Sequence, residues 1–211
     1  MAYLFRNQIA EADLVVFTKT DLYTDLPKLP GASVRHVSAT TGAGVAEWLD
    51  EVLGGRLRAG GHLLDVDYAR YAAAEAALGW LDWEAELTFS TPVTPAAVAG
   101  PLLEHLDQEL TRAAARIVHL KIFDRAETGY IKVSICRNGA EPSIEGDRIA
   151  APGRRHECLL NLRARALPAE LQRALESATR SLPAHAHILH QQAFQPAPPI
   201  PEHRYGSTFD T

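Results

Sequence analysis

One short apolar run constrains the fold of this chain more than any other feature. Residues Leu14 to Phe17 are all apolar and do not alternate with polar residues. This pattern is typical of a strand buried on both faces, as in a parallel sheet. A helix-compatible segment, 7–12, precedes the run, a second strand is predicted over 34–38, and an amphipathic helix is predicted over 45–53. Residues 1–60 therefore favour an α/β class with a parallel sheet.

Two parallel strands cannot cover themselves, because such a sheet needs further strands at its edges and helices on both faces. The predicted helix adds an apolar side formed by Val45, Leu49 and Val52, which also needs a partner surface. We therefore expect residues 1–60 to be the end of a larger α/β domain whose other strands precede Met1. A small intact domain, covered by the C-terminal half or by a second copy, is the alternative.

The second half has a different pattern. A linker with a helix is expected over 61–83, and an α+β domain over 84–194, followed by a Pro-rich tail over 195–211. The order of elements in this domain resembles a ferredoxin-like sandwich with one extra strand, whose helices cover one face of the sheet. Strands are predicted over 86–90, 117–123, 130–136, 157–165 and 188–194, and helices over 94–115 and 168–182.

Alternation along two of these strands predicts which side chains enter the core. The residues expected to face inward are Val118, Leu120, Ile122, Ile131, Val133 and Ile135. The polar positions between them, among them His119, Lys121, Lys132 and Ser134, are expected to lie on an open face of the sheet.

Composition excludes several classes of protein. The net charge of -5 is spread along the chain without a basic stripe, which argues against a nucleic-acid surface. The longest apolar runs are shorter than the roughly 20 residues that a membrane-spanning helix needs. No signal peptide is visible, and Cys136 and Cys158 are the only cysteines, so we expect a reducing, cytoplasmic location.

The candidate binding residues follow the first strand directly. The sequence there is Thr18-Lys19-Thr20-Asp21, and ligands of open α/β sheets bind beyond the carboxyl ends of the strands. Asp21 is suited to accept two hydrogen bonds from guanine, one from its ring N–H and one from its amino group, a pair that adenine lacks. The stem of Lys19 can lie along the base. The alternative is structural, with Asp21 capping the next helix and Lys19 in solvent.

A second loop follows the second strand. Its sequence, Ser38-Ala39-Thr40, offers backbone N–H groups that could bind the guanine carbonyl oxygen. Because both loops follow strands of one parallel sheet, we expect them to meet at one edge.

These segments resemble those of a known family. The segment 8–22, which contains Thr18-Lys19-Thr20-Asp21, resembles the guanine-specificity segment of the CobW-type GTPases, relatives of the HypB and UreG nickel chaperones. The segment 37–44 looks like their second base-contacting loop. Residues 67–72 and 75–81 resemble the start of the family's C-terminal region, and 194–196 through 201–205 its closing segment. The resemblance implies that Thr18, Lys19, Asp21, Ser38 and Ala39 contact the base of GTP or GDP.

The chain departs from the family in ways that limit its chemistry. Thr18 stands where the family usually has Asn, and the shorter hydroxyl reaches less far. No Gly-x-x-x-x-Gly-Lys-Ser/Thr loop is present, and neither the switch segment nor the magnesium-binding Asp can be identified. The family's cysteine-rich metal motif is also missing. No catalytic residue is therefore assigned, and we expect this chain alone not to hydrolyse GTP.

For the whole protein, the resemblance implies GTP-dependent handling of zinc or cobalt, with a metal ion held only through the missing N-terminal part. Its partners would be a guanine nucleotide and a client metalloprotein. We expect the client to contact the open sheet face at Lys121, Lys132 and Ser134. A non-catalytic protein-interaction module with a ferredoxin-like domain is the alternative.

Two other groups of residues suggest metal binding. His185 and His187 share a strand face, but simple alternation directs His190 to the other face, and no acidic residue adjoins them in sequence. We therefore interpret these histidines as polar residues at the start of a strand, without a metal. Cys136, His156 and Cys158 could meet on the open face, but they would supply only three ligands. No metal site is predicted.

Overall fold

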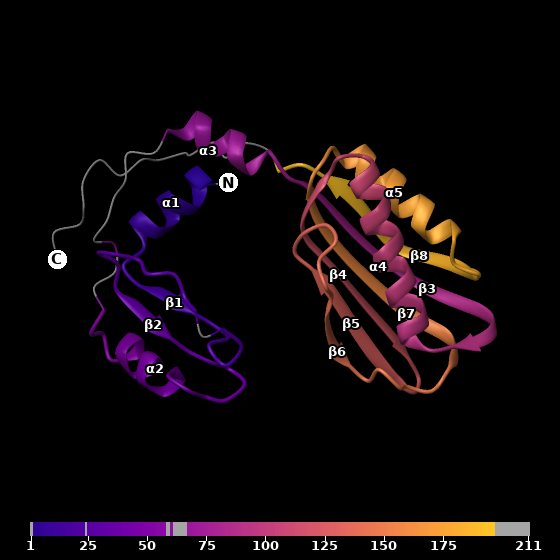
Figure 1. The fold of residues 1–211 in the computed structure, drawn as a ribbon, viewed down its shortest axis with the longest axis horizontal. Coiled ribbons are helices and arrows are strands. Elements are labelled where there is room, and N and C mark those ends of the chain that lie inside the picture. Colours follow the sequence, from indigo (N-terminus) through magenta and orange to yellow (C-terminus); the bar gives the residue numbers. More distant parts are fainter. Residues whose placement is uncertain (1, 24, 58–59, 61–66, 197–211) are drawn as a thin grey trace. The chain divides into compact units, whose positions relative to one another are not determined.

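The computed structural model describes residues 2–23, 25–57, 60 and 67–196. The chain divides into two compact units, with the boundary between Ala74 and Glu75, and each unit is described by itself (Figure 1). From residue 197 on, the predicted Pro-rich tail lies outside the described residues, as does part of the predicted linker.

The first unit contains a small parallel sheet, as the sequence predicts. Strands β1 (Val15–Phe17) and β2 (Val34–His36) pair in parallel, with Val15 opposite Val34. Helix α1 (Ala2–Glu11) precedes them and α2 (Val45–Leu53) follows them, while α3 (Tyr68–Glu75) lies at the boundary of the units. Helix α2 has the predicted bounds, and α1 begins earlier than the predicted segment.

The apolar side chains of this unit are less buried than the non-alternating pattern of residues 14–17 indicates. Strand β1 is only half-buried on both faces, and helix α2 has no buried residue. The exposed fractions of Leu49, Val52 and Leu53 are 41%, 42% and 82%. Among the described residues of this unit, Val37 is the one hydrophobic side chain that is fully buried. A sheet of two strands is too narrow to cover a helix and both of its own faces.

The second unit is a six-stranded sheet with two helices on one face (Figure 1). The strand order is β6-β5-β4-β7-β3-β8, and all neighbouring strands are antiparallel. The elements in chain order are β3 (Gly79–Val93), α4 (Pro95–Arg112), β4 (Arg116–Ala126), β5 (Gly129–Ile135), β6 (Ser143–Gly146), β7 (Gly153–Arg165), α5 (Pro168–Arg180) and β8 (Ala184–Phe194).

Several strands differ from the prediction, and β7 and β8 each begin four residues before the predicted start. Strand β3 begins at Gly79, seven residues before the predicted start. Strand β6 was not predicted, because Ser143–Gly146 is too short and too polar to alternate clearly. In β4 the register shifts between Ile117 and His119, so that Ile117 enters the core and Val118 stays half-exposed. The predicted inward position of Val118 is therefore wrong, and a bulge is the reason.

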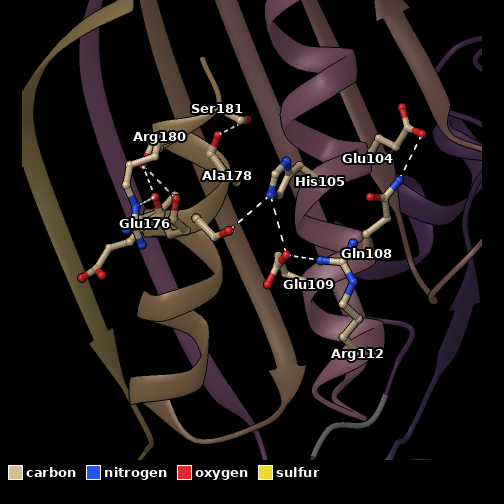
Figure 2. A network of polar contacts seen from close by, with 12 residues as sticks. Glu104, His105, Gln108, Glu109, Arg112, Glu176, Ala178, Arg180 and Ser181 are labelled. Carbon is tan, nitrogen blue, oxygen red and sulfur yellow. Dashed lines mark hydrogen bonds and ion pairs between the residues drawn. The ribbon is translucent and has the colours of Figure 1, made fainter. Parts of the chain in front are cut away.

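The helices begin where the sequence indicates. Thr94 Oγ1 accepts a hydrogen bond from Ala97 N at 3.2 Å, and Pro95 follows at the first helical position of α4. In α5, Glu170 Oε2 accepts a hydrogen bond from Leu167 N at 2.8 Å. The two helices make a polar contact in which His105 Nε2 lies 3.3 Å from the Ser177 hydroxyl. Figure 2 shows His105 of α4 on the side that faces α5.

Alternate side chains of the sheet pack under these helices. In β3, β4, β5 and β7, buried and exposed positions alternate along most of each strand, which confirms a helix-covered face and an open face. Five of the six residues predicted to face inward are buried: Leu120, Ile122, Ile131, Val133 and Ile135. These strands with α4 and α5 form one continuous hydrophobic core.

The contrast in burial predicts different local stability in the two units. Two amide hydrogens of the small parallel sheet are those of Val15, which donates to Ser33 O, and of Val37, which follows β2 and donates to Phe17 O. They should exchange at least about tenfold faster than those of Leu160 and Leu162 in β7, because few apolar contacts oppose local opening. Hydrogen exchange followed by NMR measures this. Equal protection in both units would contradict it.

Candidate functional site

The two predicted binding loops leave the parallel sheet at the same edge. Because β1 and β2 run in parallel, residues 18–21 and 38–41 both follow carboxyl ends of strands. The backbone joins the loops directly, since Thr20 N donates to Val37 O at 3.3 Å and Val37 N donates to Phe17 O at 2.9 Å. Asp21 and Ser38 are the residues next to this bridge.

The first loop is a tight turn with an unusual backbone. Lys19 has φ 59°, in the left-handed region, which costs a non-glycine residue about 1–2 kcal/mol. The turn is closed by Leu22 N, which donates to Lys19 O at 2.9 Å. The side chains of Thr18, Lys19 and Asp21 are all exposed, so a ligand can reach them. Backbone strain of this kind is common where a binding loop is held in one conformation.

The second loop is shaped by Ser38, which is 1% exposed. Its hydroxyl accepts a hydrogen bond from Thr41 N at 3.2 Å, and its own N–H donates to Ala43 O at 2.9 Å. Ser38 therefore uses its polar groups inside the loop. In the described part of the chain, the N–H groups of the exposed residues Ala39 and Thr40 have no protein acceptor, so they are the donors that this loop can offer to a ligand.

The second loop also depends on a glycine. Gly44 has φ 70°, and a Cβ atom at this position would lie 2.2 Å from the carbonyl oxygen of His36. Only glycine fits this close approach. The loop therefore returns tightly against the end of β2 before α2 begins at Val45.

One ion pair holds α2 against the strand that precedes the second loop. Arg35 donates through Nε and Nη2 to the two carboxylate oxygens of Glu51, at 2.7 and 2.5 Å. The hydrogen bond and the charge of the partner raise the pKa of Arg35 and lower that of Glu51. Sequence analysis missed this pair, because nothing in the spacing of 16 residues indicates it.

A second polar cluster lies in the core of the other unit. Asp124, His156 and Cys158 are at most 2% exposed, and His156 Nδ1 lies 2.6 Å from Asp124 Oδ2. The register places Asp124 opposite Cys158, and Asp124 Oδ1 has no hydrogen-bond partner among the described residues. The ring of His156 packs edge-on against Phe89 at 5.1 Å.

The protonation of this cluster follows from its acceptors. His156 Nε2 lies 3.2 Å from Gly153 O, and a carbonyl can only accept, so Nε2 carries a proton. Burial lowers the pKa of His156, but the hydrogen bond and charge of Asp124 outweigh this and raise it. Burial raises the pKa of Asp124, opposed by His156, and the pair thus shares one further proton. Burial, followed by the charge of Asp124, raises the pKa of Cys158, which leaves an unreactive thiol.

This geometry corrects one alternative from the sequence. His156 and Cys158 face the core, whereas Cys136 is exposed, so these three side chains do not meet on the open face. Within the described ranges, no three His, Cys, Asp or Glu side chains converge, as they stand, to hold a metal ion. None of the described helices is long and apolar enough to cross a membrane.

The close approach at Gly44 gives a matched pair of variants. Gly44→Ala should cost more than the about 1–2 kcal/mol of a left-handed alanine, because the His36 carbonyl must also move. Gly42→Ala is the control, since Gly42 has φ 78° but no atom within 4 Å of an added Cβ. Local unfolding of residues 36–45, measured by hydrogen exchange, should separate the two. Equal costs would contradict the geometry.

The buried pair predicts a pH dependence. The raised pKa of His156 means that its contribution to stability is present below the unfolded pKa of about 6.5 and is lost as the pH rises through the folded pKa. The slope is at most about 1.4 kcal/mol per pH unit. Asp124→Asn should remove it, because a neutral amide can donate a hydrogen bond to the neutral ring and carries no charge to hold the proton. Urea unfolding of the parent chain and of Asp124→Asn between pH 6 and 9 measures the two pH dependences. Parallel plots of stability against pH would refute the assignment of the raised pKa to His156.

Comparison with known proteins gives distant matches only. No protein-family model and no curated protein matches the chain. One matching solved structure is a Zn(II)-bound triple mutant of YjiA GTPase, with 14% identity over 83% of this chain and 54% of that chain, and a TM-score of 0.33. Another is Zn(II)-bound YjiA GTPase from E. coli, with 12% identity over 81% and 53%, and a TM-score of 0.31. The chain spans about half the length of these structures, and these values assign it to no family.

Proposed function

We propose that this chain is the C-terminal part of a CobW-like GTP-binding protein that handles a metal such as zinc or cobalt. In this proposal the first unit recognises the guanine base through Thr18, Lys19, Asp21, Ser38 and Ala39. The phosphate-binding loop and the magnesium ligands come from a preceding part of the domain. This chain alone does not hydrolyse GTP.

The observation that carries the proposal is the backbone bridge between the two loops. The hydrogen bond from Thr20 N to Val37 O brings a carboxylate on one side and free N–H groups on the other to the same sheet edge. Asp21 would accept from the ring N–H and the amino group of guanine, and Ala39 N–H would donate to its carbonyl oxygen. Adenine presents neither the donor pair nor that acceptor, so the arrangement discriminates between the two bases.

The incomplete burial of the first unit supports a missing partner. Strand β1 pairs with β2 on one edge only among the described residues, and the apolar side of α2 is exposed at Leu49 and Val52. A parallel sheet in a stable domain is covered on both faces. Further strands and helices of a GTP-binding domain would cover these surfaces and bring the phosphate-binding loop.

For the second unit we propose a ferredoxin-like domain that contacts the client. Without the β5–β6 hairpin, the order β4-β7-β3-β8, all antiparallel, agrees with that fold. The part of the open face at β4 and β5 is basic, and burial together with the charges of Lys121, Arg163 and Lys132 lowers the pKa of His119. Lys132 also bonds Glu145 at 2.8 Å. This surface suits an acidic client surface.

The proposed base site should prefer GDP to ADP even though the chain contains no phosphate-binding loop. Fluorescent GDP should bind the chain weakly, and Asp21→Ala should reduce the affinity by about tenfold or more, since a hydrogen bond to a charged group contributes about 1.5–3 kcal/mol. ADP should compete poorly. Fluorescence anisotropy up to millimolar nucleotide measures both effects.

Asp25→Ala is the matched control, because Asp25 is an exposed carboxylate in the same connection. It should leave the affinity for GDP unchanged. No binding at millimolar GDP, or equal losses in the two variants, would reject the guanine site and leave the second unit as a protein-interaction module.

A further inference from the structure

Three imidazoles on the edge strand β8 lie differently from the sequence prediction. Simple alternation puts His185 and His187 on one face and His190 on the other. In the structure, His190 is opposite Glu84 and Ile188 is opposite Ala85, so Leu189 is an extra residue in β8. Such a β-bulge restores His190 to the face of its partner, Glu84. The predicted orientation of His190 is therefore wrong.

Contacts on both sides of the bulge fix this face as the open one. Beyond the bulge, Phe194 stacks on Trp80 at 5.8 Å, and Trp80 belongs to the open-face positions of β3. Before the bulge, His187 Nδ1 lies 3.5 Å from Glu86 Oε2. Glu84, two residues from Glu86, is on the same face. Both segments of β8 thus direct their histidines to one surface.

Four side chains consequently form a compact group, which we call the edge quartet: Glu84, Glu86, His187 and His190. Each glutamate is directly opposite a histidine, and directly opposite residues have Cβ atoms about 4.5–5.5 Å apart. All four side chains are exposed, so they can rotate without disturbing the core. As they stand they do not converge on one point, so a metal ion would require new rotamers of these exposed side chains.

The charges around the edge quartet are mixed, and its two glutamates supply the negative charge that a cation needs. Glu157 is the neighbour of Glu86 on β7 and pairs with the guanidinium of Arg125, while Arg155, opposite Thr88, adds one positive charge to the same face. In the part of the chain that the structure describes, Glu84 has no ion-pair partner, and Glu86 is paired only with His187. Imidazole nitrogens and carboxylate oxygens, which are both ligands of zinc, therefore face one another.

We propose that the edge quartet binds one zinc ion. Two imidazole nitrogens and two carboxylate oxygens make a four-coordinate set of the kind that Zn²⁺ accepts, with Zn–N distances of about 2.0–2.1 Å. His185, opposite Thr88, lies beside the set and can replace one carboxylate. This site belongs to the second unit and does not depend on guanine binding.

The test uses the 211-residue chain in a Cys136→Ser background, which removes the exposed thiol as a competing ligand. Calorimetric titration with Zn²⁺ at pH 7.5 should show one site, and Co²⁺ should give the visible absorption of a tetrahedral complex. His187→Gln, His190→Gln and Glu86→Gln should each weaken Zn²⁺ binding at least about tenfold. Removing even a residue that only hydrogen-bonds a metal ligand costs about 10- to 100-fold in affinity, and these variants remove the ligands themselves.

Matched controls lie on the same face. Glu157→Gln removes the neighbouring carboxylate, and His119→Gln removes an imidazole on β4, and neither should change the affinity by more than about twofold. Deleting the half-exposed Leu189 should keep the site, because His190 would then be opposite Glu84 without a bulge. Failure of the parent chain to bind Zn²⁺, or equal losses in controls and quartet variants, would overturn the proposal. Binding gained only on deletion of Leu189 would overturn it too.

Discussion

The hydrogen-bonded register between neighbouring strands is the constraint on which the rest of this structure depends. In the first unit, the parallel register of β1 and β2 ends both strands at one edge, so their loops meet through Thr20 and Val37. In the second unit, the antiparallel register decides which side chains enter the core and which stay on the open face. A shift by one residue would exchange the two faces.

The two units satisfy this constraint to different degrees. The six-stranded sheet has two helices over one face and a continuous core beneath them. The two-stranded sheet is in parallel register but is too narrow to cover α2, so Leu49 and Val52 stay exposed. A strained Lys19 and an obligatory Gly44 nevertheless fix the loop geometry. Two loops held in a fixed geometry are compatible with the proposed base-binding role.

Polar groups are treated differently inside and outside the core. Asp124, His156 and Cys158 are buried, His156 bonds Asp124, and burial raises the pKa of Cys158, so the thiol of this cluster is unreactive. The edge quartet is exposed and only partly paired, so a metal ion in solvent can reach it. Similar residue types thus serve opposite purposes, because solvent reaches one group and not the other.

The sequence by itself determined the type of most elements, from the apolar run at Val15 to the cap at Thr94, and it located the two loops after parallel strands. These features depend on local periodicity and turn chemistry. The tertiary structure alone decided that Asp124 meets His156, that Arg35 pairs with Glu51, and that His190 shares a face with His187. Those contacts depend on strand order and on bulges, and a bulge changes the parity of a strand without a signal in local sequence.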